Sequence, residues 1–490
     1  MIVLASVVAA CTGSTSGPTT TTEATTTIAQ PPTTASPPTT RPASPDETLT
    51  SIGDPFYPAL GNGGYDVTRY DIELTLLDDG TIVGFTTVTA VATADLDRFS
   101  LDFGSTSATP DDQPTVDAVR VDGVDAGWDH DGEELVVTPP AALTAGASFV
   151  TEVEYSPVAS AAESRALPVA VGWYEGPSGV RYVVAEPDGA HRWFPSNDHP
   201  SDKATFSISV TVPAGTIAAA NGSLVDQIDD IGTTTFVWEE DDPMATYLAT
   251  VVVSDRYAVV RDEAAWAATG IDVRHILPDD MADDPPIALD RTAEMIGVLS
   301  DLFGPYPFDE YGVAFVDGFG AALENQTLSL FDTELADAPI LELVLIHELA
   351  HQWFGDSLTP RWWEDIWLNE GFATFAELLW IEHEGGETAY RDEIRRRIGQ
   401  ARSSGLGPPG SPSPSNLFAG GVYQRGALTL VALRDEVGDD VFFEILRAYT
   451  ARYAYGNVTT ADFVAVAEEL SDRDLSVLFD TWLYDDQIPG

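Results

Sequence analysis

Three residues within one segment have the types and the spacing to bind and use a metal ion: His347, Glu348 and His351. The segment 341–354, LELVLIHELAHQWF, is apolar nearly all round, which predicts a buried helix. Burying two imidazoles and a carboxylate there without partners would be costly. Because the histidines are four residues apart, both rings share one helix face and can ligate one ion, while Glu348 can reach a water held there. The alternative is a chance H-E-x-x-H pattern on a packed helix, which is disfavoured in a chain with only seven histidines.

A third ligand is expected at Glu370, nineteen residues after His351 and early in the next long helix. An antiparallel return of the chain would bring its carboxylate back to the two histidines. Two histidines, a glutamate and one open position are typical of catalytic zinc, whereas structural zinc sites have four protein ligands, commonly cysteines. Glu370 could also be a helix-start carboxylate that interacts with the helix dipole, and both roles can hold together. We therefore expect one zinc ion per chain, a metal that the ligand chemistry favours over other divalent ions.

The elements that carry these residues follow a β-rich stretch. Between residues 51 and 255, short segments rich in Val, Ile, Thr and aromatic residues alternate with Gly, Asp, Asn and Pro turns. This pattern predicts an N-terminal domain of antiparallel strands arranged as a sandwich or saddle. The expected strands are 70–77, 81–93, 118–121, 135–138, 149–155, 206–212, 233–238 and 247–253.

From residue 256 to 490 the pattern becomes mixed and then mainly helical. Two strands are expected, at 271–277 and 311–316, with a helix near 284–303 between them. Beyond residue 340 the periodicity and the turn residues predict a series of helices. These are 340–354, 365–385, 387–403, 420–436, 439–454, 459–470 and 473–483.

The first fifty residues indicate export. Residues 1–10 are small and apolar, as in the core of an export signal, although the expected basic residues before them are missing. The sequence Val8 to Cys11 resembles the lipobox of bacterial lipoproteins, and a linker rich in Thr and Pro follows over 11–50. We expect Cys11 to be lipidated and the protein to be anchored to a bacterial membrane on its outer or periplasmic side. The alternative is a plain cleaved signal with an incidental cysteine.

Composition excludes several classes of protein. The formal net charge is −56, with a pI near 4.1, so nucleic acid would be repelled and anionic membrane surfaces are disfavoured. A single cysteine forbids an intramolecular disulfide. The hydrophobic content of 44% over 490 residues is enough for two or three folded domains. No segment after residue 10 is long and apolar enough to cross a membrane. Oligomeric state cannot be predicted from the sequence.

Several motifs in a fixed order resemble one family, the gluzincin aminopeptidases of the aminopeptidase N and leukotriene hydrolase type. H-E-x-x-H is followed by W-W-x-D-x-W-L-N-E-G-F-A over 362–373. Ala321, Ala322, Leu323, Glu324 and Asn325 resemble the G-x-M-E-N exopeptidase motif, on an edge strand before the metal-binding helix. The segment 422–426, VYQRG, resembles the one that carries the catalytic tyrosine, and 192–206 resembles a block of the β domain. The resemblance covers nearly all of the chain after residue 50.

This resemblance implies a β saddle followed by a thermolysin-like zinc peptidase domain that removes single residues from peptide N-termini. Glu348 would act as the general base on a zinc-bound water, and the Tyr423 hydroxyl would stabilise the oxyanion. Glu324 and Glu186 would bind the free α-ammonium group, with Ala321, Ala322 and Asn325 completing the substrate-binding segment. Taken alone, Tyr423 could be a core aromatic residue, and each glutamate could be a solvated charge in an acidic chain.

Departures from the family pattern put fine substrate contacts in doubt more than the reaction. Ala321 and Leu323 replace Gly and Met, Ser196 and His199 replace Cys and Glu, and Val184 replaces a Gln. The large C-terminal helical domain of many relatives is expected to be absent, which would leave the site more open. An endopeptidase of thermolysin type is one alternative, and a non-catalytic scaffold with the same fold is another. Epoxide hydrolysis is conceivable only by analogy.

Overall fold

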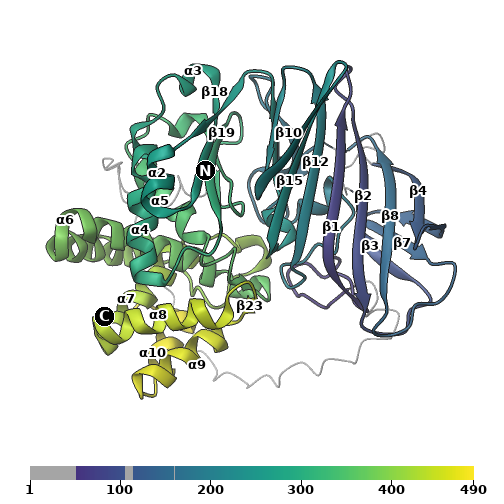
Figure 1. The fold of residues 1–490 in the computed structure, drawn as a ribbon. Coiled ribbons are helices and arrows are strands. Elements are labelled where there is room, and N and C mark those ends of the chain that lie inside the picture. The colour runs from purple at the N-terminus through teal and green to yellow at the C-terminus, as the bar shows by residue number, and fades with distance from the viewer. Residues whose placement is uncertain (1–50, 105–113, 159, 490) are drawn as a thin grey trace, which may run out of the picture.

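The computed structural model describes residues 51–104, 114–158 and 160–489. Within these ranges most of the strands gather on one side of the molecule, and the helices lie on the other side around a smaller sheet that contains β18 and β19 (Figure 1). The predicted order of a β-rich N-terminal domain and a mainly helical second domain is therefore confirmed. The predicted export signal at 1–10, Cys11 and the linker up to residue 50 lie outside the described residues. No helix in the described ranges combines the length and the apolar character needed to cross a membrane.

An eight-stranded sheet forms the larger layer of the N-terminal domain. Residues on β1 and β2 alternate between buried and more exposed positions, because successive side chains of a strand point to opposite faces. Neighbouring strands are antiparallel except β1 and β12, which pair in parallel and make the sheet mixed. In order across the sheet the strands are β14 (Ser223–Asp230), β15 (Thr233–Met244), β12 (Ala204–Pro213), β1 (Tyr65–Leu76), β2 (Ile82–Ala92), β8 (Ser148–Ser156), β4 (Thr115–Val121) and β5 (Val124–Asp125).

Two smaller sheets complete the β domain. The five-stranded sheet is almost fully buried on its central strands, and β11 leads directly into the segment that contains Glu186. Its strands are β13 (Ile217–Ala220), β16 (Val251–Ser254), β11 (Arg181–Val184), β10 (Ala170–Glu175) and β9 (Ala162–Glu163). The three-stranded sheet contains β3 (Phe99–Asp102), β7 (Glu134–Thr138) and β6 (Gly127–Asp131).

The second domain begins with a mixed five-stranded sheet that helices cover. β18, β19 and β21 run parallel, and β20 pairs antiparallel at the edge, where an edge strand carrying the exopeptidase motif was expected. In order the strands are β17 (Tyr257–Arg261), β18 (Asp272–Pro278), β19 (Glu310–Val316), β21 (Ser329–Asp332) and β20 (Ala322–Leu323). Two short strands pair in parallel: β22 (Thr359–Pro360) and β23 (Asn457–Val458). They connect the segment between the two helices expected to carry the metal ligands to the C-terminal helices.

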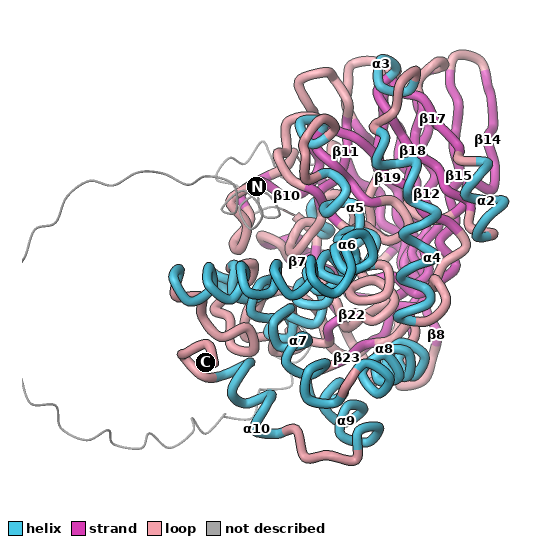
Figure 2. Tube along the Cα trace, turned by 90° about the vertical axis from the view of Figure 1, so that its left-hand side faces the viewer, coloured by secondary structure: helices cyan, strands magenta, loops and turns pink. Residues whose placement is uncertain are grey.

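The helices follow the predicted order with a few differences. They are α2 (Glu263–Thr269), α3 (Asp279–Ala282), α4 (Thr292–Phe303), α5 (Leu341–His351), α6 (Trp367–Ser404), α7 (Gly426–Val437), α8 (Asp439–Tyr453), α9 (Thr460–Ser471) and α10 (Ser476–Phe479). α6 crosses the front of the domain in Figure 2, and α7 to α10 pack below it. The two helices expected at 365–385 and 387–403 are confirmed: both lie within the range of α6 and are separated by a break in the helical backbone at Gly386, with φ 70° and ψ −177°.

Two local predictions were wrong. The strand expected at 247–253 begins only at Val251, because Thr246–Leu248 form a 3₁₀ turn that reaches toward the second domain. The helix expected from residue 284 begins at Thr292, because Pro285 and Pro286 precede a 3₁₀ turn at Ile287–Arg291. Neither difference moves the helices that carry the predicted site.

Candidate active site

The helix α5, which carries the expected metal ligands, is buried from Val344 to His351, as its apolar sequence predicted. His347, Glu348 and His351 are each only 1% exposed. α5 packs against α6, whose first turn contains Glu370, itself 3% exposed. The chain reverses between these helices through the turn at 352–366, so that the first turn of α6 faces the last turns of α5. This return brings the expected third ligand to the two histidines.

One oxygen of Glu370 faces the same ring nitrogen of both histidines. Oε2 of Glu370 lies 3.3 Å from Nε2 of His347 and 3.6 Å from Nε2 of His351. Ligands of a tetrahedral zinc ion at bond lengths of about 2.0–2.1 Å lie about 3.3 Å from one another. The three side chains therefore fit zinc in both chemistry and spacing.

Both histidines are oriented by hydrogen bonds from their other ring nitrogen. Nδ1 of His347 lies 2.9 Å from Oε1 of Glu377, and Nδ1 of His351 lies 3.0 Å from the Phe354 carbonyl oxygen. These acceptors place the proton on Nδ1 and leave the Nε2 lone pair facing the shared point. Nη2 of Arg397 lies 2.7 Å from the second oxygen of Glu377, which holds that carboxylate in turn.

Glu348 is a buried carboxylate with neither oxygen hydrogen-bonded by the protein. Burial raises its pKa to about 8, against the opposing effect of His347 and His351. One of its oxygens lies within 4.8 Å of ligand atoms of Glu324 and His351. A buried carboxylate without protein donors is suited to accept a proton from a water or a substrate in the same cavity.

Glu186 and Glu324 come from different domains and meet beside the expected zinc ligands. Glu186 follows β11 of the β domain, and Glu324 follows β20 of the second domain. Oxygens of Glu186, Glu324 and Glu370 lie within 4.8 Å of one another. Burial, and then the Glu324 carboxylate, raise the pKa of Glu186 well above its ordinary value, and burial also raises the pKa of Glu324. A cation bound between these two carboxylates would stabilise their ionised forms.

Tyr423 lies over His347, the first of the expected zinc ligands. Its ring is nearly parallel to that of His347, with centroids 6.1 Å apart and an interplanar angle of 15°. It sits in a single π-helical turn, Gly421–Arg425, that leads into α7, and such turns are frequent at functional sites. Burial, followed by the Glu370 carboxylate, raises the pKa of Tyr423 well above its ordinary value. The hydroxyl therefore stays protonated and can donate a hydrogen bond.

The remaining residues of the predicted substrate-binding segment are also buried at this site. Ala321, Ala322 and Asn325 are at most 4% exposed. Asn325 donates from Nδ2 to the Leu248 carbonyl oxygen at 3.0 Å, while its Oδ1 has no hydrogen-bond partner. This unpaired acceptor is available to a backbone N–H of a bound peptide.

The residues that depart from the β-domain block have structural partners instead. Ser196 pairs through its backbone with Asp102 in an isolated antiparallel bridge. His199 contacts Asp54 through Nε2 at 2.9 Å and packs against Trp362 of the second domain. His199 therefore lies at the junction of the domains, Ser196 pairs within the β domain, and neither is among the residues expected to hold the metal.

Sequence reasoning missed the residues that form hydrogen bonds with the expected zinc ligands or hold their partners in place. Glu377 lies seven positions after Glu370, which is two helical turns along the same face of α6, so the spacing could have pointed to it. Arg397 and Gln352 could not have been found in this way. Arg397 reaches Glu377 only after the break at Gly386, and the partners of Gln352 lie on another segment.

Comparisons with known proteins place the chain in a family. The profile described as "Peptidase family M1 domain" matches residues 287–482, and "Peptidase M1 N-terminal domain" matches residues 67–248. A solved M1 zinc metallopeptidase from Deinococcus radiodurans, crystallised with a Tyr-Ser-Ala substrate, is 31% identical. The alignment covers 90% of this chain and 99% of that one, with a TM-score of 0.81. The chain therefore belongs to the M1 peptidase family.

Curated relatives are longer proteins. Aminopeptidase M1 of Arabidopsis thaliana is 30% identical over 321 residues, which cover 61% of this chain and 36% of that protein. Aminopeptidase N of Streptomyces lividans is 30% identical over 329 residues, covering 62% of this chain and 38% of that protein. The matched region thus spans a little more than a third of the length of these relatives.

Proposed function

We propose that this protein is a zinc-dependent aminopeptidase that removes single residues from the free N-terminus of peptides. One observation carries the proposal: the buried carboxylates of Glu186 and Glu324 lie together beside the His347, His351 and Glu370 site. The three ligands fit zinc, and the carboxylate pair fits the α-ammonium group that only a peptide N-terminus supplies.

The chemistry of each side chain follows from its place. Zinc held by the three ligands would supply Lewis acidity for the attacking water and the scissile carbonyl. Glu348 accepts the proton of the attacking water and passes it to the leaving amine, because the protein donates to neither of its oxygens and one of them lies within 4.8 Å of His351. The Tyr423 hydroxyl donates a hydrogen bond to the oxyanion that forms at the carbonyl.

The carboxylate pair argues for an exopeptidase over an endopeptidase. An internal peptide bond offers no cation to Glu186 and Glu324, so binding a chain through the site would leave two buried carboxylates uncompensated. A bound N-terminal ammonium compensates both and places the first peptide bond near the metal site. The related Deinococcus radiodurans enzyme, which carries a Tyr-Ser-Ala substrate, supports a short peptide as the substrate class.

The test compares a free-amino dipeptide amide with its N-acetylated form, with and without a zinc chelator. We expect hydrolysis of the free form only, abolished by the chelator and restored by zinc. Hydrolysis of both forms would favour an endopeptidase and would remove Glu186 and Glu324 from the amine site. Zinc binding without hydrolysis of either form would favour a non-catalytic scaffold.

We further propose that the protein is exported and held at a bacterial membrane through a lipid on Cys11. The support is the apolar segment 1–10, the lipobox-like Val8 to Cys11 and the Thr/Pro-rich spacer that follows. Metabolic labelling with a fatty-acid probe tests this in the native bacterial setting. We expect label on the wild type and none on Cys11→Ser; an unlabelled wild type recovered in the medium would contradict the anchor.

A further inference from the structure

The segment 321–327 carries Glu324 and is held from two sides. It leaves the edge strand β20, and no helix or sheet covers its backbone groups after Leu323. Three of those groups are nevertheless hydrogen-bonded, one by the β domain and two by the residue that follows the zinc helix α5. We refer to residues 321–327 as the exopeptidase segment.

Gln352 makes the contacts from the zinc helix. Its Nε2 donates to the carbonyl oxygen of Glu324 at 3.1 Å, and its Oε1 accepts from the backbone N–H of Thr327 at 2.8 Å. Both hydrogen bonds are buried, and the side chain is 0% exposed. Gln352 follows the zinc ligand His351 directly, so a single side chain connects the amine-binding residue to the metal ligand next to it.

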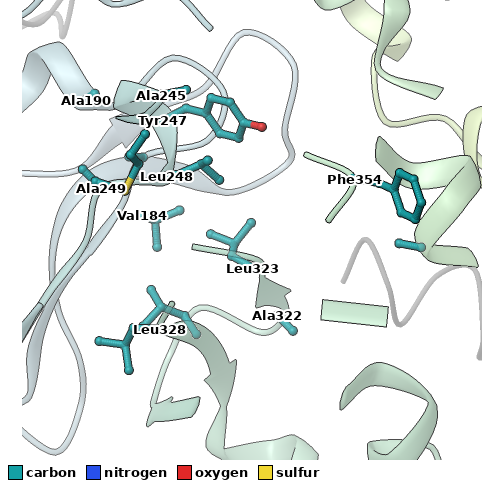
Figure 3. Close-up of a cluster of buried hydrophobic side chains, with 14 of the residues drawn as sticks. Val184, Ala190, Ala245, Tyr247, Leu248, Ala249, Ala322, Leu323, Leu328 and Phe354 are labelled. Atoms are coloured by element: carbon teal, nitrogen blue, oxygen red, sulfur yellow. The ribbon is translucent and has the colours of Figure 1, made fainter. Parts of the chain in front are cut away.

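The β domain makes the contacts on the other side. Nδ2 of Asn221 donates to the Gln326 carbonyl oxygen at 2.6 Å, and the N–H of Gly222 donates to Oγ1 of Thr327 at 2.8 Å. Apolar contacts accompany these bonds: Leu248 and Val184 of the β domain lie in the same buried cluster as Leu323 (Figure 3). The exopeptidase segment is therefore part of the domain junction.

The backbone of Thr327 shows that the segment is held in a strained form. Its φ is +62°, the left-handed region that β-branched residues rarely adopt. A strained residue persists where its surroundings determine its conformation. At Thr327 the surroundings are the Gln352 acceptor on its N–H and the Gly222 donor on its hydroxyl.

We propose that Gln352 is a positioning residue that sets the distance between the ammonium-binding carboxylate of Glu324 and the metal site. This inference rests on the proposed aminopeptidase function. The distance from the ammonium site to the metal decides which peptide bond reaches the reacting water. If the Glu324 carboxylate is displaced, a peptide N-terminus binds more weakly. The second peptide bond, in place of the first, can then lie at the metal site. Gln352 therefore controls both the affinity for the free amine and the release of one residue at a time.

The test uses Gln352→Met, which keeps the length of the side chain and removes both hydrogen bonds. We expect the KM of a free-amino dipeptide amide to rise about tenfold, with a smaller change in kcat. With the peptide Tyr-Ser-Ala, mass spectrometry is expected to detect intact Tyr-Ser alongside free tyrosine at the earliest times. Zinc content, measured by metal analysis of the purified protein, is expected to stay at one per chain.

Matched variants separate positioning from general packing. Tyr306→Phe removes a longer contact of 3.4 Å to the same Oε1 and a 3.0 Å hydrogen bond to the Glu310 carbonyl oxygen. It leaves both bonds from Gln352 to the exopeptidase segment, so it should keep the wild-type KM. Glu324→Gln should reproduce the rise in KM. Gln352→Glu keeps the acceptor for the Thr327 N–H, so its KM is expected to lie between those of the wild type and Gln352→Met. If Gln352→Met does not fold, Gln352→Glu provides the test in its place.

The outcomes distinguish this inference from the function on which it rests. A wild type that does not prefer the free amine contradicts the proposed function. A wild type that prefers it, together with a Gln352→Met variant of unchanged KM and unchanged product pattern, overturns the role of Gln352 alone. Equal rises in KM for Tyr306→Phe and Gln352→Met would also overturn it, because general loosening would then explain both.

Discussion

Gly371 and Gly426 touch where α6 and α7 cross. A Cβ atom built on Gly426 would lie 2.9 Å from the Cα of Gly371, and one built on Gly371 would lie 3.0 Å from the Cα of Gly426. Gly371 follows the ligand Glu370, and Gly426 lies three residues after Tyr423. The absence of both side chains lets the helices approach closely, which brings the tyrosine over the metal site.

Gly426→Ala should separate these helices and displace Tyr423. Overpacking a tight contact costs about 1–3 kcal/mol of stability, so the melting temperature and kcat should both fall. Gly399→Ala is a matched control within α6, because its Cβ would meet nothing within 4 Å. That variant should be neutral or more stable by up to about 1 kcal/mol. Equal stability of the two variants in thermal unfolding would contradict the close crossing.

Glu377→Ala should weaken zinc binding. The Glu377 carboxylate accepts from Nδ1 of His347, and loss of such a partner commonly costs about 10–100-fold in metal affinity. Competition with a chromogenic chelator measures the dissociation constant. Glu393→Gln is the control, since Glu393 contacts Arg397 at 2.9 Å but does not contact His347. Unchanged zinc affinity in Glu377→Ala would show that His347 needs no such orientation.

Glu348→Gln should bind zinc normally and lose turnover. Its carboxylate is not among the three predicted ligands, and the amide cannot accept the proton of the attacking water. General-base catalysis contributes about 10²–10⁴-fold, so kcat should fall by that factor. Metal analysis checks the zinc content, and steady-state kinetics on the same preparation check the loss of turnover. A rate near that of the wild type would remove Glu348 as the base.

Tyr423→Phe should lower kcat with little change in KM. The ring can still stack on His347, but the hydroxyl that donates to the oxyanion is gone. Loss of one such donor costs about 10²–10³-fold in kcat. A rise in KM at constant kcat would instead place the hydroxyl in ground-state binding of the substrate.

The contribution of His191 to the stability of the β domain should fall as pH rises above neutrality. Burial alone would lower the pKa of His191, but Asp198 and Glu133 raise it from 6.5 to about 10. Because the folded state holds this proton more tightly than the unfolded state, the contribution is fully present below pH 6.5 and is lost as pH rises to about 10. Urea unfolding of the wild type and of a variant without this histidine, compared across that range, measures the decline.

His191→Gln isolates this contribution from other titrating groups. The buried Lys203, whose pKa burial lowers to about 7, acts in the opposite sense between pH 7 and 10.5. Both groups contribute in the wild type, whereas the variant lacks only the histidine. The difference in unfolding free energy between the two proteins should therefore shrink as pH rises, and a constant difference would contradict the raised pKa of His191.

Some features could be predicted because they depend on local spacing. His347 and His351 are one helical turn apart, so their shared face follows from helix geometry alone. The β-then-helical order followed from the change in hydrophobic period near residue 255. Even so, β10 and β11 were not predicted, and β14 was missed because all of its residues are exposed and no buried face marks it.

The sequence by itself therefore determined the types of ligand, the helix that presents two of them and the order of the domains, since each rests on contacts within a few residues. The tertiary structure decided which distant side chains meet. Glu186 and Glu324 are 138 positions apart, and the pairing of Gln352 with the exopeptidase segment depends on how the zinc helix packs against the edge strand. Such hydrogen bonds join distant segments and leave no periodic pattern in the sequence. Their atoms meet because two elements pack against each other, not because residues repeat at a fixed spacing along one helix or strand.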